Sequence, residues 1–174
     1  MAILPILIHP DPRLKVKCTP VTDFDDALKT LSEDMLETMY DAPGIGLAAP
    51  QVGVTRRMLV MDCAGKEDEP QPMVLVNPEV IAASEEMNTY NEGCLSIPEQ
   101  FDDVERPAEV TVRFQDVEGN SFTQDFAGIW ATCVQHEIDH LDGKLFIDYL
   151  SRMKRGMITR KMEKLKRDRA LEAS

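Results

Sequence analysis

The spacing of apolar and polar positions differs from one part of the chain to another. Over residues 23–40 the apolar side chains recur at three- and four-residue steps, which predicts an amphipathic helix with Asp23 at its N-terminal cap. Residues 58–61 and 73–76 are short continuous apolar runs, so we expect two buried strands separated by the acidic, proline-containing loop 65–72. The first half of the chain therefore combines one helix with buried strands.

The second half contains a pattern typical of a β-hairpin. Residues 109–114 and 121–126 alternate apolar and polar side chains around the turn residues 118–120. We expect a helix from about 127 to 141, where an Asp-Gly pair ends it, and a last helix from about residue 150. Strands grouped apart from helices indicate an α+β fold, with antiparallel sheets around the helix at 127–141 and a further helix at the C-terminus.

Length and composition indicate a single globular domain. The chain has 174 residues, of which 43% are hydrophobic and 29% charged. We expect residues 1–150 to form the body of the domain and 151–174 to form a basic helix of the same domain. The apolar run 2–4 is cut by Pro5, and the first basic residue is Arg13, so we expect no secretory signal, no membrane span and a cytoplasmic location.

Charge is distributed unevenly along the chain. The formal net charge is -12, yet residues 1–150 carry 10 Lys and Arg against 28 Asp and Glu, while 151–174 carry 9 against 3. The acidic body disfavours general nucleic-acid binding, whereas the basic tail can dock on a phosphate-rich partner. The competing interpretation of the tail is a solvated helix face that keeps the protein soluble.

The strongest local signal is the HExxH motif formed by His136, Glu137 and His140. Two histidines four residues apart lie on one face of a helix and can share a divalent metal. The alternative is accidental spacing, but the chain has three histidines and two of them flank this glutamate. The motif therefore predicts a metal site on the helix at 127–141.

A catalytic site of this kind needs a third ligand, for which the cysteines are candidates. Cys133 shares the helix, but it lies ~7.5 Å along the axis from the midpoint of the two histidines, which makes it a poor ligand. Cys94 comes from a distant segment whose glycine and proline suit a loop that approaches another backbone closely. Spacing does not exclude Cys18 and Cys63, which we expect to be buried structural thiols.

A glycine-rich segment, GIGLAAPQVG, imitates a dinucleotide-binding fingerprint through Gly44, Gly46 and Ala49. It follows a helix rather than a strand, and Pro50 interrupts the helix that such a fingerprint opens, so nucleotide binding is disfavoured. Gln51, taken alone, is a loop amide of the kind that satisfies nearby backbone groups.

Three segments together resemble the peptide deformylase family. GIGLAAPQVG, EGCLSIP and QHEIDH stand in that family's order, and the resemblance covers essentially the whole chain. It implies that Cys94, His136 and His140 bind a metal, ferrous iron in bacterial members, with zinc, nickel or cobalt as substitutes. It further implies that Glu137 acts as general base and acid while metal-activated water removes the formyl group from N-formyl-methionyl nascent peptides and releases formate.

The same resemblance assigns the groups around the reacting bond. The side-chain amide of Gln51 and the backbone N–H of Leu95 would donate hydrogen bonds to the oxyanion, and Arg106 would pair with Glu92. Phe101 departs from the arginine or tyrosine of many members, which leaves recognition of the peptide beyond methionine open. The pocket for the methionine side chain would be lined by residues that could each instead be plain core: Ile45, Gly46, Tyr90, Glu92, Ile129 and Cys133.

Resemblance also supplies a partner for the basic tail, because the C-terminal helix of the bacterial enzymes meets the ribosome near the exit tunnel. A monomer is the default expectation. The positions expected to contact the ribosome are Arg152, Lys154, Arg155, Arg160, Lys161 and Lys164.

Two other functions are compatible with the HExxH motif alone. A zinc endopeptidase typically takes a third His or Glu from farther along the chain, and no histidine follows His140. A metal-stabilised binding module needs a closed four-ligand site, in which Glu137 would have no use between the two ligands. The sequence therefore favours the hydrolase that the resemblance implies.

Overall fold

The computed structural model describes residues 2–173 and contains three α-helices, three short 3₁₀ turns and seven strands over that range. The α-helices are α1 Asp26–Asp41, α2 Gly128–Leu141 and α3 Arg152–Ala173. The 3₁₀ turns are η1 Pro12–Lys15, η2 Ala49–Val52 and η3 Phe146–Tyr149. The strands are β1 Gly46–Ala48, β2 Met58–Met61, β3 Met73–Ala83, β4 Met87–Cys94, β5 Ile97–Pro107, β6 Glu109–Gln115 and β7 Ser121–Ala127.

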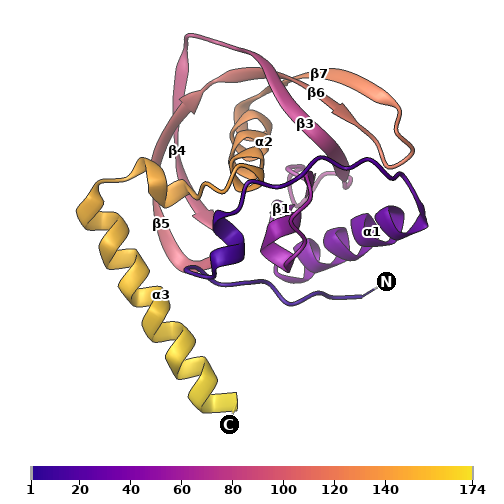
Figure 1. Cartoon of the computed structure of the whole chain (residues 1–174). Helices are drawn as coiled ribbons and strands as arrows, with labels where there is room; N and C mark the ends of the chain where they lie inside the picture. The colour runs from indigo at the N-terminus through magenta and orange to yellow at the C-terminus, as the bar shows by residue number, and fades with distance from the viewer. Residues whose placement is uncertain (1, 174) are drawn as a thin grey trace.

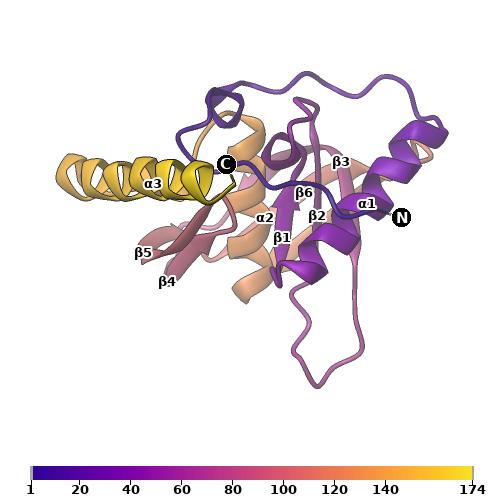
Figure 2. The same cartoon turned by 90° about the horizontal axis from the view of Figure 1, so that it is seen from below.

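The described strands form two antiparallel sheets that surround α2. One sheet has five strands in the order β1-β2-β3-β6-β7, and the other is the β4-β5 hairpin. Figure 1 shows α2 between the curved large sheet and the β4-β5 hairpin, while Figure 2 shows α1 and α3 on opposite sides of the molecule. This arrangement confirms the predicted α+β fold with a central helix and a further helix at the C-terminus.

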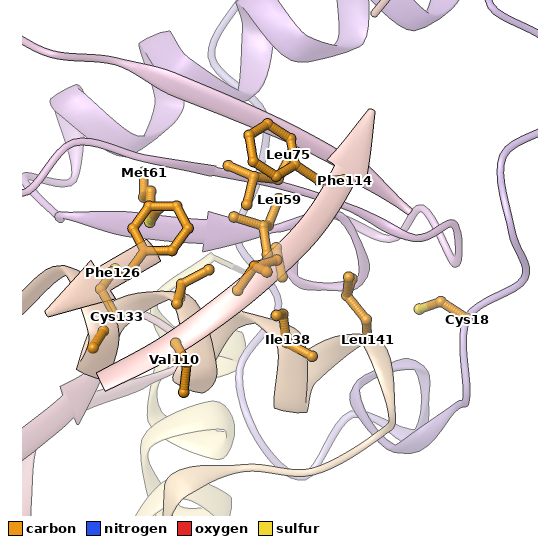
Figure 3. Packing of buried hydrophobic residues seen from close by; sticks show 14 residues of the cluster. Cys18, Leu59, Met61, Leu75, Val110, Phe114, Phe126, Cys133, Ile138 and Leu141 are labelled. Carbon is orange, nitrogen blue, oxygen red and sulfur yellow. The ribbon is translucent and has the colours of Figure 1, made fainter. Parts of the chain in front are cut away.

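The core lies between the large sheet and α2. Leu59, Leu75 and Phe126 from the strands pack with Val134 and Ile138 from the helix, as Figure 3 shows for the labelled members of this cluster. All of these side chains are less than a tenth exposed. Because such burial removes apolar surface from water along one face of α2, this packing fixes the helix that carries the HExxH motif against the large sheet.

The β4-β5 hairpin was not predicted, and its existence corrects the expected loop around Cys94. Cys94 is the last residue of β4, one step after Gly93, which faces Phe101 across the hairpin. A Cβ atom at Gly93 would overlap the Phe101 ring. The glycine therefore serves close side-chain packing across two strands rather than a loop.

The start of α1 also differs from the prediction. Asp25, and not Asp23, caps the helix, because its carboxylate accepts a hydrogen bond from the backbone N–H of Leu28 at 3.0 Å. The end of α2 matches the expected Asp-Gly stop. Gly143 has a φ of +78°, and a Cβ there would lie 2.6 Å from the carbonyl oxygen of Lys15.

Helix α3 leaves the body on the side of the β4-β5 hairpin (Figure 1). Ile158 and Met162 are its buried side chains in the described part of the chain, and Leu165 packs beside them against a cluster that includes Leu14 and Phe146. The chain contains no helix, among residues 2–173, that is long and apolar enough to cross a membrane.

A buried histidine connects the N-terminal segment to α3. His9 is 3% exposed, and its Nε2 lies 2.9 Å from the Thr159 hydroxyl, while its Nδ1 has no partner in the described structure. Burial, together with Lys15 and Lys166, lowers the pKa of His9 from 6.5 to about 4, although Asp148 opposes the shift.

This histidine should make the protein sensitive to mild acid. The unfolded chain takes up a proton at His9 below about pH 6.5 and the folded chain only near pH 4, so the free energy of unfolding should fall by about 2–3 kcal/mol over that window. His9→Gln should flatten this part of the pH dependence in urea titrations. An identical slope in wild type and variant between these pH values would contradict the assignment.

Candidate metal centre and its cavity

Helix α2 presents the three residues of the HExxH motif together in the interior. His136, Glu137 and His140 are 8%, 5% and 1% exposed, and the two imidazole rings have their centroids 5.0 Å apart. The four-residue spacing places both rings on the same face of the helix. Their burial distinguishes them from ordinary surface histidines.

The end of β4 brings Cys94 to these histidines. Its Sγ lies 3.4 Å from Nε2 of His140, and one donor atom from each of Cys94, His136 and His140 lies within 4.8 Å of the other two. One thiolate and two imidazoles are a donor set that suits zinc or a first-row transition metal. Cys133 does not join this group, and the residues present therefore fit a single divalent metal.

A buried ionic network orients His136. Its Nδ1 lies 3.0 Å from Glu92, whose carboxylate also accepts hydrogen bonds from Nε and Nη2 of Arg106 at 2.7 and 2.9 Å. The expected pairing of Arg106 with Glu92 is confirmed. Burial by itself would raise the pKa of Glu92, but the hydrogen bonds from His136 and Arg106 lower it. With the Nδ1 proton donated to this carboxylate, Nε2 of His136 is left to bind a metal.

The network extends to two residues that the sequence did not reveal. Arg106 donates from Nη1 to Asp139 at 2.8 Å, and the Tyr149 hydroxyl donates to the same carboxylate at 2.7 Å. The Tyr149 ring also lies under the Arg106 guanidinium, 4.8 Å from its carbon. Burial and the Asp139 carboxylate raise the pKa of Tyr149 to about 12. Asp139 is one of the two variable positions inside the HExxH motif, but its position in the sequence did not predict the contact with Arg106.

The pKa values of the two histidines are shifted in opposite directions. Burial lowers the pKa of His136, but Glu137 and the Cys94 thiol outweigh it and raise that pKa. Burial and the neighbouring charge of His136 lower the pKa of His140. A metal requires both imidazoles to be neutral, so protons would compete with a metal for these nitrogens.

Glu137 lies against the cavity as a buried carboxyl group. Desolvation raises its pKa to about 7, although His136 opposes the shift, and its Oε1 has no hydrogen-bond partner in the described structure. Oε1 lies 4.0 Å from Nε2 of His140. A Cβ atom on Gly46 would lie 2.5 Å from Glu137 Oε2, so the carboxyl group occupies space that only glycine leaves free.

Gln51 uses its two ends differently. Its side-chain oxygen accepts a hydrogen bond from the backbone N–H of Ala48 at 2.9 Å, as the interpretation of a local loop amide requires. Its Nε2 points the other way, 3.1 Å from the Ser96 hydroxyl and 3.5 Å from Cys94 Sγ. Gln51 thus places an N–H donor beside Cys94, one of the three candidate metal ligands. Leu95 also lines the cavity in front of these groups.

A cavity of about 760 Å³ opens onto the candidate centre. Ile45 and Ile129 are 46% and 39% exposed at its rim, which excludes the plain-core interpretation for both. Cys133 is buried, with its thiol 3.6 Å from the carbonyl oxygen of Ile45. The cavity is lined by all six residues expected around methionine, Ile45, Gly46, Tyr90, Glu92, Ile129 and Cys133.

Sequence reasoning missed most of the other walls of this cavity, although it had connected Phe101 with recognition of the peptide beyond methionine. The N-terminal segment contributes Ile3 and Ile6, the β4-β5 hairpin contributes Phe101, and α3 contributes Arg169. None of these segments shares a motif with the HExxH helix. Only the folded chain brings them to the same opening.

The basic side chains expected at the ribosome occupy α3. Arg152, Arg160, Lys161 and Lys164 are exposed, and Arg155 is half-buried. Two of the six form ion pairs within the chain. Lys154 lies 3.2 Å from Asp102 on β5, and Arg155 lies 3.9 Å from Asp148.

Comparisons with known proteins agree with the geometry. The family model of polypeptide deformylase matches residues 3–156. A peptide deformylase of Rhizobium meliloti is 51% identical over 173 residues, covering 99% of each chain. Among solved structures, a peptide deformylase from Legionella pneumophila has a TM-score of 0.89 and 48% identity, covering 97% of this chain and 98% of its own.

A second solved structure is the peptide deformylase of Ehrlichia chaffeensis in complex with actinonin. It has a TM-score of 0.90 and 40% identity, covering 96% of this chain and 99% of its own. These matches span the HExxH helix, the β4-β5 hairpin and the glycine-rich segment alike. The chain therefore belongs to the polypeptide deformylase family and is a hydrolytic enzyme of that family.

Proposed function

We propose that this enzyme removes the N-formyl group from formyl-methionyl nascent peptides and releases formate. The observation that carries the proposal is the buried Glu137. Desolvation raises its pKa to about 7, its Oε1 has no partner in the described structure, and it lies beside the cluster of Cys94, His136 and His140 that could hold a metal. Membership of the family supports the same reaction.

Cys94, His136 and His140 would hold one divalent metal, and we propose ferrous iron, with zinc, nickel or cobalt able to replace it. Such a metal supplies Lewis acidity, which lowers the pKa of water and polarises a carbonyl group. The neutral imidazoles and the thiolate suit these metals. The Arg106 network would keep the His136 ring in the orientation that ligation requires.

Glu137 would carry the proton through the reaction. Its ionised oxygen takes a proton from the attacking water, whose oxygen bonds to the formyl carbon. The same carboxyl group then gives the proton to the departing amine as the carbon–nitrogen bond breaks. A pKa of about 7 suits a group that must act first as base and then as acid near neutral pH.

Two donors would stabilise the oxyanion that develops on the formyl oxygen. The Nε2 of Gln51 is one, because the hydrogen bond to Ala48 fixes the other end of its amide and leaves this end near Cys94. The backbone N–H of Leu95, directly after the cysteine, is the other. Donors held in place before the reaction need no reorganisation when the charge forms.

The apolar part of the cavity would hold the methionine side chain. Cys133 and Gly46 form a small inner wall, and Ile45 and Ile129 lie at the opening. The aliphatic part of Glu92 and the ring of Tyr90 complete the lining. An unbranched apolar side chain can pack against such a surface. Few polar groups are then buried without a hydrogen-bond partner, which would be costly.

We further propose that the enzyme works in the cytoplasm as a monomer and docks on the ribosome through α3. Its cations Arg160, Lys161 and Lys164 are exposed, while Ile158 and Met162 are buried against the body, so the cations are available to phosphate groups. Deleting the whole helix would uncover that apolar pair. Charge removal at exposed positions is therefore the cleaner test than truncation.

The proposed reaction is tested by formate release from formyl-Met-Ala, measured beside cleavage of an internal peptide bond in an unformylated peptide. Formate release alone is expected. Cleavage of the internal bond would favour a zinc endopeptidase, and absence of both activities in the metal-loaded protein would favour a binding module.

Glu137→Ala should lower kcat by about 10²–10⁴, the range for losing a general acid and base, with metal content still near one per chain. Kinetics of formate release and elemental analysis of the same sample check this expectation. Glu137→Gln serves as the control of similar size and should be equally impaired. Activity retained in either variant would remove Glu137 from the mechanism.

Cys94→Ala should lose metal and activity together, because the remaining two imidazoles bind a divalent ion weakly. Cys133→Ala should keep the metal and change mainly KM, since its thiol lies in the cavity wall. Elemental analysis after dialysis separates the two variants. The reverse pattern would show that Cys133 is the ligand.

Replacing Arg160, Lys161 and Lys164 by alanine should abolish ribosome co-sedimentation at low salt and leave turnover of a short formyl peptide within about threefold of wild type. Wild-type binding should weaken steeply with salt. In a plot of the logarithm of the binding constant against the logarithm of salt concentration, the slope should steepen by nearly one unit for each phosphate contacted. The matched control removes three exposed cations of the body, Lys17, Lys29 and Lys66. Undiminished ribosome binding by the tail variant would disprove docking through this face.

A further inference from the structure

One side of α3 faces the body, and the residues on that side recur at helical spacing. Ile158 and Met162 are buried, and Leu165 packs against the same cluster as they do. With 100° per residue, Arg169 lies only about 20° around the helix from Ile158, whereas Arg167 lies about 180° away. Arg169 therefore continues the inward stripe, and Arg167 points outward.

Contacts along α3 hold this stripe in place. At the start of the helix Lys154 pairs with Asp102 of β5 at 3.2 Å, and in its middle Thr159 lies 2.9 Å from His9. Figures 1 and 2 agree that the C-terminal end of α3 lies beneath the N-terminal segment. Arg169 is thus presented by an anchored helix.

Arg169 lines the same cavity as the candidate metal centre. Among the lining residues that the structure describes it is the sole arginine or lysine, while the acidic lining residues are Asp41, Glu92, Glu99 and Glu137. Glu92 is already neutralised by Arg106. The guanidinium of Arg169 is therefore the one group on this wall that attracts an anion permanently.

The neighbouring part of the rim is apolar. Ile3 and Phe101 are 52% and 63% exposed and line the cavity with Arg169. The cavity volume of about 760 Å³ lies in the upper part of the range for sites that enclose whole small ligands. More of a peptide than its first side chain can therefore be accommodated between the metal ligands and α3.

We propose that Arg169 binds a carboxylate of the substrate peptide downstream of the formyl-methionyl residue, so that α3 takes part in selecting substrates. The proposal rests on the proposed deformylase reaction. A guanidinium matches a carboxylate with two parallel hydrogen bonds, and the acidic body would otherwise repel such a peptide. Because the site is open to solvent, the expected preference is only about two- to fivefold.

The test compares formyl-Met peptide amides that carry Asp or Asn at the third, fourth or fifth position. For the wild-type enzyme we expect kcat/KM to favour Asp at one position by about two- to fivefold, through KM rather than kcat, and less at high salt. A second series of neutral peptides, with a free or amidated C-terminus, separates a terminal carboxylate from a side-chain carboxylate.

Arg169→Ala should remove the preference and leave turnover of the Asn peptides unchanged, and Arg169→Lys should retain part of it. Arg167→Ala is the matched control, because it removes the same charge from the outward side of the helix. The proposal is overturned if Arg169→Ala affects Asp and Asn peptides equally, if Arg167→Ala acts as strongly, or if the wild type shows no preference.

The same experiments distinguish failure of the proposed deformylase reaction from failure of the proposed role of Arg169. If the deformylase reaction itself were wrong, the wild-type enzyme would release no formate from any of these peptides. If only the role of Arg169 were wrong, formate would be released from all of them without regard to the downstream charge.

Discussion

The buried ion pair between Arg106 and Glu92 is the interaction on which the rest of the site depends. Two hydrogen bonds of 2.7 and 2.9 Å join them in a region where both side chains are about 5% exposed. Arg106 also donates to Asp139, so one guanidinium links the β4-β5 hairpin to α2. Losing either partner would leave an uncompensated buried charge, which is far more costly than losing a surface pair.

This pair connects structure to chemistry through His136. Glu92 stands between Arg106 and the imidazole, and it stays ionised because both neighbours donate to it. The ring is thereby turned with its free nitrogen toward Cys94 and His140. The strand that carries Glu92 ends at Cys94, so the element that supplies the proposed third ligand also orients the His136 ring.

Packing of α2 imposes a second constraint. One face of the helix is buried against the large sheet through Val134 and Ile138, and the motif residues occupy the other face. Glu137 is consequently taken out of water without a fixed partner, which raises its pKa to about 7. The energetic cost of burying an unpaired carboxyl group is the physical basis of its proposed role, because it makes the group ready to accept and return a proton.

Much of this protein could be predicted from local sequence. Helical spacing by itself places His136 and His140 on one face, an apolar run locates β2, and alternation of apolar and polar residues locates the β6-β7 hairpin. The segments around Gln51 and Cys94 identify the family. These features depend on residues close together in the chain, where the geometry of a helix or strand leaves few alternatives.

What only the tertiary structure decided is which distant segments meet. The β4-β5 hairpin escaped prediction because its polar alternation is weak, and the single arginine that joins Glu92 to Asp139 follows no local pattern. The cavity likewise unites the N-terminal segment, Phe101 and Arg169, which lie far apart in the sequence. Such contacts arise when whole helices and strands pack together, so the spacing of residues within one element cannot predict them.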